Sequence, residues 1–274
     1  MTAPIIESPP EPTRPATRWS RLLGSAAALH LQQWQAQRAE RLLADVFGYH
    51  AVQIGQPETD WLQANRMPHR WRARAECDPL PSLASPPGAG PRHDLEMDTR
   101  AWPWSAASLD LVVLPHTLEW CADAHLCLRE VERVLMPGGR VLIAGLQPWR
   151  WWSRKAQRHP EGREGLQPIA LGRLRDWLRL LDFEVEALSL GGWMPPLGSP
   201  AALQRLAWMD RWGPHALPGL QGHYLLLATK RVAGMHWLPG LRREGVPSRR
   251  LRAVPAAGSQ SLLSPASTLT KNPS

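Results

Sequence analysis

The sequence predicts an α/β fold with an open, mostly parallel, doubly wound sheet, and three features carry this expectation. Leu109 to Leu114, LDLVVL, is a continuous apolar run of the kind that a strand buried on both faces requires. Arg140 to Ala144, RVLIA, is a second run of this kind. Between them lies an amphipathic helix that Asp123 caps and that extends to Leu135, with Pro137-Gly138-Gly139 as its stop. Strand, helix and strand in this order form a βαβ unit with parallel strands.

The elements before this unit follow from apolar spacing and turn residues. From residue 18 to about 48, apolar residues recur at intervals of three and four, which predicts one or two amphipathic helices that form an N-terminal cap. We expect a short strand at 51–55 that Gly55 closes, a helix at 58–65 and a strand at 70–75. Residues 78–92 are rich in Pro and Gly and predict a loop.

The elements after the unit complete the predicted domain. We expect a helix at 171–181, a strand at 183–188 and a final strand at 224–229, with a lid or insertion at about 189–218. The predicted organisation is therefore a disordered arm at 1–17, a helical cap at 18–48, an α/β domain at 49–231 and a disordered basic tail at 232–274.

Composition and charge exclude several classes of protein. With 43% hydrophobic and 20% charged residues, the chain matches neither a disordered protein nor a coiled coil. No run of eighteen apolar residues exists, and the first residues lack the basic and apolar segments of a signal peptide, so we expect a cytoplasmic protein without a membrane span. The formal net charge is +8, but residues 231–274 alone carry +6. The sequence therefore predicts a weak contact of the tail with nucleic acid or an acidic partner, and nucleic-acid binding or methylation that depends on the tail is a further hypothesis.

The expected ligand site lies at the carboxyl ends of the parallel strands, where open α/β sheets bind their ligands. Just after the apolar runs come Gly55, Asp98, Pro115, His116 and Gly145. These positions are the first to inspect for chemistry.

Residues 98–144, DTRAWPWSAASLDLVVLPHTLEWCADAHLCLREVERVLMPGGRVLIA, closely resemble the corresponding part of class I S-adenosylmethionine-dependent methyltransferases, specifically the methyltransferase type 11 group. The family pattern reads approximately D-A-E-x-L-P-F, a variable pair, S-F-D-x-V, and then a helix with R-V-L-x-P-G-G. The residues that fall on it in order and spacing are Asp98, Pro103, Trp104, Ser108, Asp110, Val112, Arg133, Val134, Leu135, Pro137, Gly138 and Gly139. The resemblance implies a Rossmann-like class I methyltransferase fold and transfer of a methyl group from S-adenosyl-L-methionine to an unidentified acceptor.

The resemblance also implies where the cofactor binds. In the family, the first strand ends in a loop like D/E-x-G-x-G-x-G, whose glycines admit the methionine end of the cofactor. Here Gln53 stands at the acidic position and, of the glycines, only Gly55 is kept. Glu76 and Asp78 are the acids nearest to the expected ribose position, and Asp98 stands where the family places an acid near the adenine amino group. The residues expected to contact the cofactor are Gln53, Gly55, Glu76, Asp98, Leu114 and Pro115.

His116 is the candidate catalytic residue. A histidine after the central strand would face the cleft and could deprotonate a substrate oxygen or nitrogen, because its pKa lies close to working pH. A histidine that packs or orients a loop is an equally good interpretation. Cys121 and His125, four residues apart, do not make a metal site, and none is expected.

Two further interpretations stay open at this level. Because the glycine loop is degenerate, the chain could keep the fold without catalysis and act as a binding or scaffold protein. Trp149, Trp151 and Trp152, beside Arg150 and Arg154, could bind an apolar substrate or pack as a lid. Asp110 is expected to tie the start of its strand to a neighbouring backbone. No motif specifies the acceptor or the oligomeric state.

Overall fold

The computed structural model describes residues 17–56, 59–76, 93–217 and 219–231. The predicted arm except Thr17, the predicted loop at 78–92 and the predicted tail at 232–274 lie outside the described residues. The division into domains therefore stays a prediction. The elements in chain order are α1 (Arg18–Leu23), α2 (Ser25–Leu43), β1 (His50–Ile54), β2 (His69–Ala75), β3 (His93–Met97), β4 (Leu109–Pro115), the 3-10 helix η1 (Thr117–Glu119), α3 (Ala124–Val134), β5 (Leu135–Leu146), α4 (Trp151–Ala156), α5 (Pro160–Gly165), α6 (Leu171–Leu180), β6 (Phe183–Gly191), α7 (Pro200–Ala216) and β7 (His223–Lys230).

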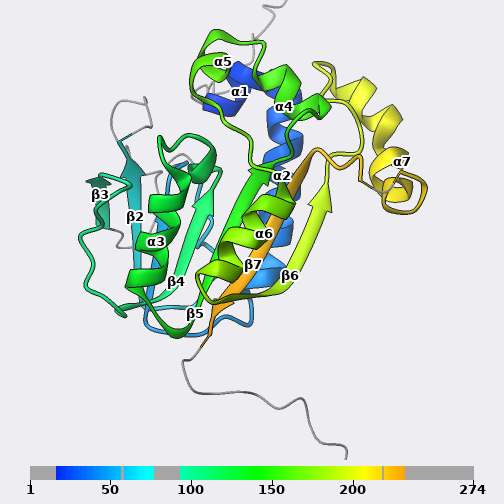
Figure 1. Cartoon of the computed structure of the whole chain (residues 1–274). Helices are drawn as coiled ribbons and strands as arrows, with labels where there is room; N and C mark the ends of the chain where they lie inside the picture. The colour runs from blue at the N-terminus through cyan, green and yellow to red at the C-terminus, as the bar shows by residue number, and fades with distance from the viewer. Residues whose placement is uncertain (1–16, 57–58, 77–92, 218, 232–274) are drawn as a thin grey trace, which may run out of the picture. The chain divides into compact units, whose positions relative to one another are not determined.

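Seven strands form one sheet in the order β3-β2-β1-β4-β5-β7-β6, as Figure 1 shows. The strands from β1 to β5 pair in parallel, and β7 is antiparallel to both of its neighbours. This arrangement confirms the predicted open, mostly parallel α/β sheet. It also brings the carboxyl ends of β1, β2, β3 and β4 to one edge of the sheet, on adjacent strands.

Alternating side chains of the strands build two separate cores. In β4, Val112 and Leu114 face the helices α3 and α6, whereas Leu111 and Val113 face the carboxyl half of α2. Successive residues of a strand point to opposite faces, so a continuous apolar run supplies both cores. Complete burial of one such side chain contributes about 1.5–3 kcal/mol to the stability of the fold. A strand with apolar side chains on both faces gains most where both faces are covered, which is at the centre of the sheet.

A third core joins the N-terminal helices to the carboxyl edge of the sheet. Trp19 of α1 and Leu31 of α2 pack with Leu146, the last residue of β5, and with Trp152 of α4. Helix α2 is 19 residues long, so it packs on the sheet with one half and reaches past the carboxyl edge with the other. The helical cap is consistent with its sequence prediction.

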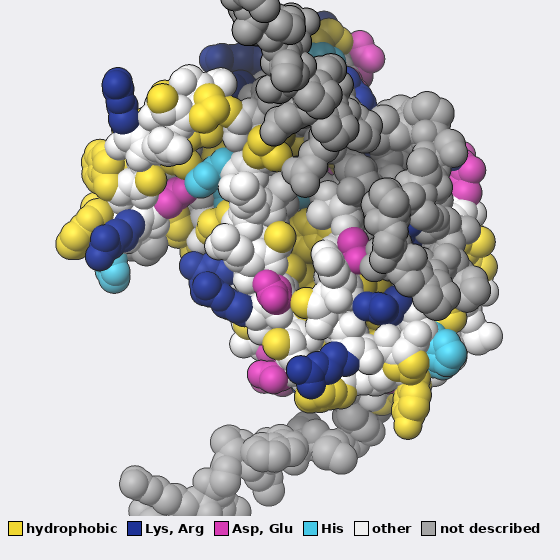
Figure 2. Space-filling model, turned by 180° about the vertical axis from the view of Figure 1, so that it is seen from behind, with side chains coloured by type: hydrophobic (Ala, Val, Ile, Leu, Met, Phe, Trp, Pro, Cys, Tyr) yellow, Lys and Arg dark blue, Asp and Glu magenta, His cyan; other side chains and the backbone are white. Residues whose placement is uncertain are grey.

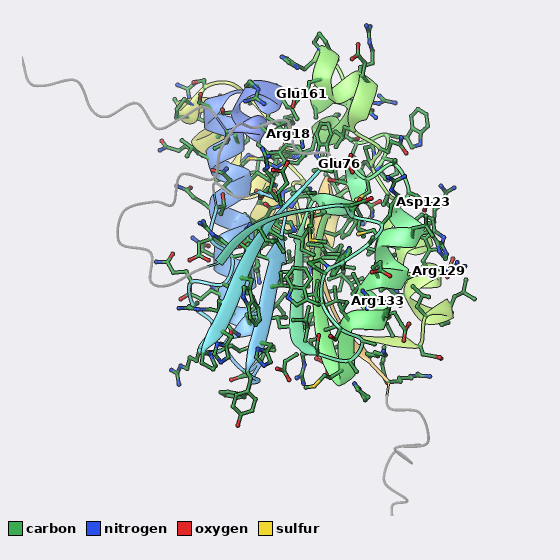
Figure 3. All side chains as sticks on the ribbon, turned by 90° about the vertical axis from the view of Figure 1, so that its left-hand side faces the viewer. Arg18, Glu76, Asp123, Arg129, Arg133 and Glu161 are labelled. Carbon is green, nitrogen blue, oxygen red and sulfur yellow. The ribbon has the colours of Figure 1, made fainter. Side chains whose placement is uncertain are left out.

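Ionic contacts attach the first helix of the cap. The Nε of Arg18 lies 2.8 Å from Oε1 of Glu161 on α5, and its guanidinium lies 3.7 Å from the centre of the Trp120 ring. Figure 3 shows Arg18 and Glu161 together above the sheet. The cap is thereby tied to the segment between β5 and α6.

Four sequence predictions of local structure need correction. Residues 59–66 form turns instead of a helix, because the Asp60 carboxylate accepts from Leu62 N and the Asn65 amide donates to carbonyls at the end of α2. Strand β3 was not predicted, since a Pro- and Gly-rich segment precedes it. Helix α3 ends at Val134 and β5 begins at once, so Pro137 lies inside the assigned strand. Strand β6 extends to Gly191, so an insertion can begin only after it.

The described helices are too short or too polar to cross a membrane, and the surface of the described residues carries mixed charge (Figure 2). None of the described helices is long and apolar enough to span a membrane. On the face seen in Figure 2, basic side chains lie singly among acidic and apolar ones. The charge of the described residues is thus spread over this face.

Candidate functional site

The turn after β1 lies against the turn after β4, and Gly55 makes this approach feasible. Gly55 has φ +87°, and a Cβ at this position would lie 2.7 Å from Oγ1 of Thr117, which itself donates to the carbonyl of Ile54. The Gly55 N–H donates to the carbonyl of Ala73 on β2 at 2.9 Å. Gly55 therefore offers a close backbone surface but no free N–H group.

Gln53 shapes this turn from within. Its side chain is fully buried, and Nε2 donates to the carbonyls of Gly55, Gln56 and Thr59 at 3.1, 3.1 and 2.7 Å. Its Oε1 accepts from Trp61 N at 2.9 Å. The amide is occupied within the chain, so any contribution of Gln53 to a cofactor site would be made through the shape of the loop.

Gln56 was missed by sequence reasoning. It follows Gly55, has φ +45°, and is 8% exposed. Neither its Nε2 nor its Oε1 has a hydrogen-bond partner among the described residues. A buried amide without partners is costly, typically about 1–3 kcal/mol, unless a ligand or water satisfies it. Only the glycine motif around it could have drawn attention to this position.

Two predicted acids lie at the ends of neighbouring strands. Glu76 follows β2 and is exposed, and Asp98 follows β3 with 38% of its side chain exposed. Figure 3 shows Glu76 at the upper edge of the sheet, below the cap. Arg100 interacts with both acids: it hydrogen-bonds Asp98, and Glu76 contributes to raising its pKa. The hydrogen bonds from Arg100 lower the pKa of Asp98, so this carboxylate stays ionised near neutral pH.

Leu114 and Pro115 end β4 beside β5. Both are buried, and they pair with Ile143 and Ala144.

Near the start of β4, Oδ2 of Asp110 accepts from the N–H groups of Tyr49 and His50, at 2.8 and 2.9 Å. This contact agrees with the predicted structural role of Asp110.

His116 follows Pro115 and belongs to a buried network. It has the left-handed conformation, with φ +60°. Its Nδ1 lies 2.7 Å from Oε2 of Glu119, and its Nε2 lies 2.6 Å from Nε2 of Gln35 on α2. All three side chains are 1% exposed. The other carboxylate oxygen of Glu119 accepts from Leu146 N, so the acid is held by two strand ends.

Aromatic side chains close the network. The ring of Trp19 lies 4.5 Å from that of His116, centre to centre. His223, at the start of β7, is fully buried and packs edge-on against Trp34 and Trp152. Burial, with smaller effects from His116 and His30, holds the pKa of His223 well below its usual value. The carboxyl ends of β4, β5 and the start of β7 therefore meet under the cap.

Two signals in the sequence could have identified the partners of His116. Glu119 follows it by three residues, within reach after a tight turn. Gln35 lies in the series Leu31, Gln35, Ala39, where it is the one polar member of a buried stripe at four-residue spacing. A polar residue on an apolar stripe requires a buried partner.

The other features considered in the sequence take separate positions. Trp152 is buried in the third core, whereas Trp149 and Trp151 are 80% and 47% exposed. The Cys121 thiol donates to the carbonyl of Thr117, and the His125 ring packs edge-on against the indole of Trp177. Among the described residues, no group of three or more His, Cys, Asp or Glu side chains is arranged to hold a metal ion.

The strand order of the sheet defines the fold. A mostly parallel sheet in this strand order, with polar residues following four adjacent strands, is the class I methyltransferase fold. A family model described as a methyltransferase domain matches residues 79–143. This segment of the chain is thus similar to methyltransferase domains of the type 11 group.

Curated relatives match over part of the chain. The uncharacterized protein YafS of Escherichia coli (strain K12) is 28% identical over 176 residues, which cover 61% of this chain and 62% of the relative. The chain thus spans less than two thirds of that protein. A malonyl-[acyl-carrier protein] O-methyltransferase of Erwinia billingiae is 45% identical over 49 residues, 18% of this chain and 20% of the relative.

Solved structures show the same fold. A chain in the complex of the Haloferax volcanii Trm112 methyltransferase activator with a methyltransferase is similar with a TM-score of 0.58, 18% identity, and coverage of 78% of this chain and 97% of that one. An S-adenosylmethionine-dependent methyltransferase of Mesorhizobium loti is similar with a TM-score of 0.51, 16% identity, and coverage of 73% and 98%. At these identities the likeness concerns the fold.

The described residues fit the cofactor that this class implies, S-adenosyl-L-methionine. Its amino acid end needs hydrogen-bonding groups near a close backbone turn, which Gln56 and Gly55 provide. Its ribose needs an acid at the end of the second strand, where Glu76 is exposed. Asp98 lies one strand further, with an exposed carboxylate. These polar groups thus lie in a row at the carboxyl ends of three adjacent strands.

Proposed function

We propose that the protein is an S-adenosylmethionine-dependent methyltransferase that transfers a methyl group to an unidentified acceptor. The observation that carries the proposal is the row of polar groups at the carboxyl ends of three adjacent strands: Gln56 after β1, Glu76 after β2 and Asp98 after β3. In this proposal Gly55 and Gln56 hold the methionine end and Glu76 holds the ribose hydroxyls. Asp98 accepts from the adenine, while Leu114 and Pro115 form the floor.

The sulfonium of the cofactor supplies a methyl group with a good leaving group, so orientation can provide most of the rate acceleration. The residues of this chain therefore need to fix two reactants and exclude water. The buried cap around Trp19 and Gln35 covers the carboxyl ends of β4 and β5, and this cover supports a water-excluded acceptor site. His116 is the proposed group that touches the acceptor.

Isothermal calorimetry with S-adenosylmethionine and S-adenosylhomocysteine tests the proposal. We expect micromolar binding by the full chain and a loss of affinity of about tenfold or more in Glu76→Ala, because an exposed carboxylate that accepts two hydroxyl donors is removed. Glu96→Ala is the matched control: Glu96 is an exposed acid on the neighbouring strand, and its carboxylate pairs with Arg74.

Two outcomes would contradict the proposal. If a folded sample binds neither compound at millimolar concentration, the chain has the fold without the cofactor, and the binding or scaffold interpretation replaces this one. If both variants bind as the parent does, the cofactor does not lie along Glu76. Circular dichroism of each variant shows that the fold is intact.

A further inference from the structure

We propose that the methyl acceptor presents a hydroxyl or amine proton that His116 removes, with Glu119 as its positioning residue, and that the acceptor is therefore not a carboxylate. This inference rests on the proposed methyl transfer and narrows it to a class of acceptor. It follows from the protonation state that the buried contacts of His116 require.

The contacts fix which imidazole nitrogen carries the proton. An ionised carboxylate can only accept, so Oε2 of Glu119, 2.7 Å from Nδ1, places the proton of the neutral ring on Nδ1. His116 Nε2 is then the acceptor, and the Gln35 amide at 2.6 Å presents its N–H to it. A carboxylate that holds Nδ1–H leaves a basic lone pair on Nε2, which is the arrangement that activates a histidine as a general base.

Glu119 is held in place so that it can serve this purpose. Its Oε1 accepts from Leu146 N and its backbone carbonyl accepts from Gln167 N at 2.8 Å. A carboxylate that is 1% exposed is costly unless it is hydrogen-bonded, and each of its oxygens has a donor here. For a purely structural role, a neutral side chain in place of Glu119 could accept the same hydrogen bonds without the cost of a buried charge.

Gln35 marks the position that the acceptor takes. Its amide presents an N–H to the base from the cap, with the Trp19 ring packed on the imidazole. When the acceptor binds, its O–H or N–H replaces this donor at Nε2, which requires α1 and the first half of α2 to shift. The exchange preserves the hydrogen bond to His116, so displacement of Gln35 leaves no buried acceptor unpaired.

The chemical step balances without a further reactant. The acceptor proton moves to His116 Nε2, and the resulting imidazolium is paired with Glu119. The freed electron pair on the acceptor oxygen or nitrogen forms the bond to the methyl carbon. The bond between that carbon and sulfur breaks, and its electrons stay on sulfur as a neutral thioether.

A carboxylate acceptor fits this site poorly. At neutral pH it has no proton for the base to remove, and it would face the Nε2 lone pair with the Glu119 charge behind the ring. Among the described residues, the titratable groups near the pair include Glu119 itself, His223, whose lowered pKa keeps it neutral, and Tyr224, whose pKa is raised by burial and by Glu119, while His30 on α2 is paired with Asp210. None of these supplies a positive charge at neutral pH.

The test follows the chemical stability of the product. The full chain is incubated with S-adenosylmethionine that carries a tritiated methyl group. An extract of cells of the source organism is added to supply the acceptor. Mild base then releases the label from methyl esters as volatile methanol, whereas methyl ethers and methylamines keep it. We expect base-stable label, reduced on the order of 10²-fold or more in both His116→Gln and Glu119→Gln, with unchanged calorimetric affinity for S-adenosylhomocysteine.

The pH profile separates a base from a structural residue. The labelling rate of the parent should reach a plateau as the pH rises, whereas the rate of Glu119→Gln should keep rising, as ionisation of the acceptor replaces the lost base. His125→Gln, a histidine outside the network, is the matched control and should match the parent.

Base-labile label, or equal labelling by the parent and both variants, would overturn the acceptor class and leave the methyltransferase proposal intact. Absence of cofactor binding would overturn the proposed function itself. Cofactor binding without any label transfer to the extract would contradict both.

Discussion

One residue of β1, Gln53, shapes the turn that glycines form in the family pattern. The Gln53 amide donates to three carbonyls of the following loop, so the loop is shaped by a side chain instead of by glycine flexibility. An acid at this position, as the family pattern has it, would place a carboxylate against those three carbonyl oxygens. The departure from the motif is therefore a change in how the turn is built.

Gln53→Glu should destabilise the protein, although it restores the residue type of the motif. We expect the free energy of unfolding to fall by about 2–4 kcal/mol, because a buried charge replaces a donor to three acceptors. Urea unfolding followed by circular dichroism measures the difference. Gln33→Glu, at an exposed position on α2, is the control, and equal stability of the two variants would show that the loop does not depend on Gln53.

Asp110→Ala should also lower stability. Its carboxylate accepts from two consecutive N–H groups that begin β1, and removal leaves both without this partner. A loss of about 1–3 kcal/mol is expected in urea unfolding. Asp45→Ala, at an exposed acid just after α2, should change stability by less than about 0.5 kcal/mol. A smaller loss in Asp110→Ala than in this control would contradict the role.

The buried His223 makes stability depend on pH. Burial keeps its folded pKa well below the ordinary 6.5, so below pH 6.5 the unfolded chain binds a proton that the folded chain does not. Stability from this residue is complete above pH 6.5 and is lost on acidification, by at most about 1.4 kcal/mol per pH unit. Thermal unfolding between pH 7.5 and 5.5 should show a shallower dependence in His223→Leu, and identical slopes would contradict it.

Among the elements, the segment between β3 and β4 depends on one helix. Arg133 of α3 donates to the carbonyls of Trp102 and Trp104 and to Glu130, which accepts from Trp102 N at 2.9 Å. This segment begins at Asp98, a proposed cofactor residue. Helix α3 thus positions the adenine end of the proposed site from outside it, as Figure 3 shows for Arg133 on its helix.

The Glu130 pair gives this element its own pH dependence. Hydrogen bonding from Arg133, against some desolvation, lowers the pKa of Glu130 below the usual 4.5. A lowered carboxyl pKa means that the stabilisation is complete above pH 4.5 and is lost as the pH falls through the folded value. The free energy of unfolding should therefore fall less steeply between pH 5 and 3 in Glu130→Gln than in the parent. A parallel decline in both proteins would contradict this role.

At the scale of the whole molecule, the sequence predicts the sheet better than the site. The runs LDLVVL and RVLIA have to be central strands because both faces are covered, and β4 and β5 are central. The site depends on contacts between segments distant in sequence, such as Gln35 with His116: the buried stripe of α2 indicates that Gln35 needs a partner, but not which residue that partner is. Periodicity also could not reveal β3, a short strand of mixed polarity at the sheet edge.

The central claim is that the polar row along the carboxyl edge binds S-adenosylmethionine, and a crystal structure with S-adenosylhomocysteine tests it most directly. We expect the amino acid end against Gly55 with a hydrogen bond to the Gln56 amide, and the ribose hydroxyls on the Glu76 carboxylate. A ligand bound elsewhere, or crystals that stay free of ligand at millimolar concentration, would contradict the account.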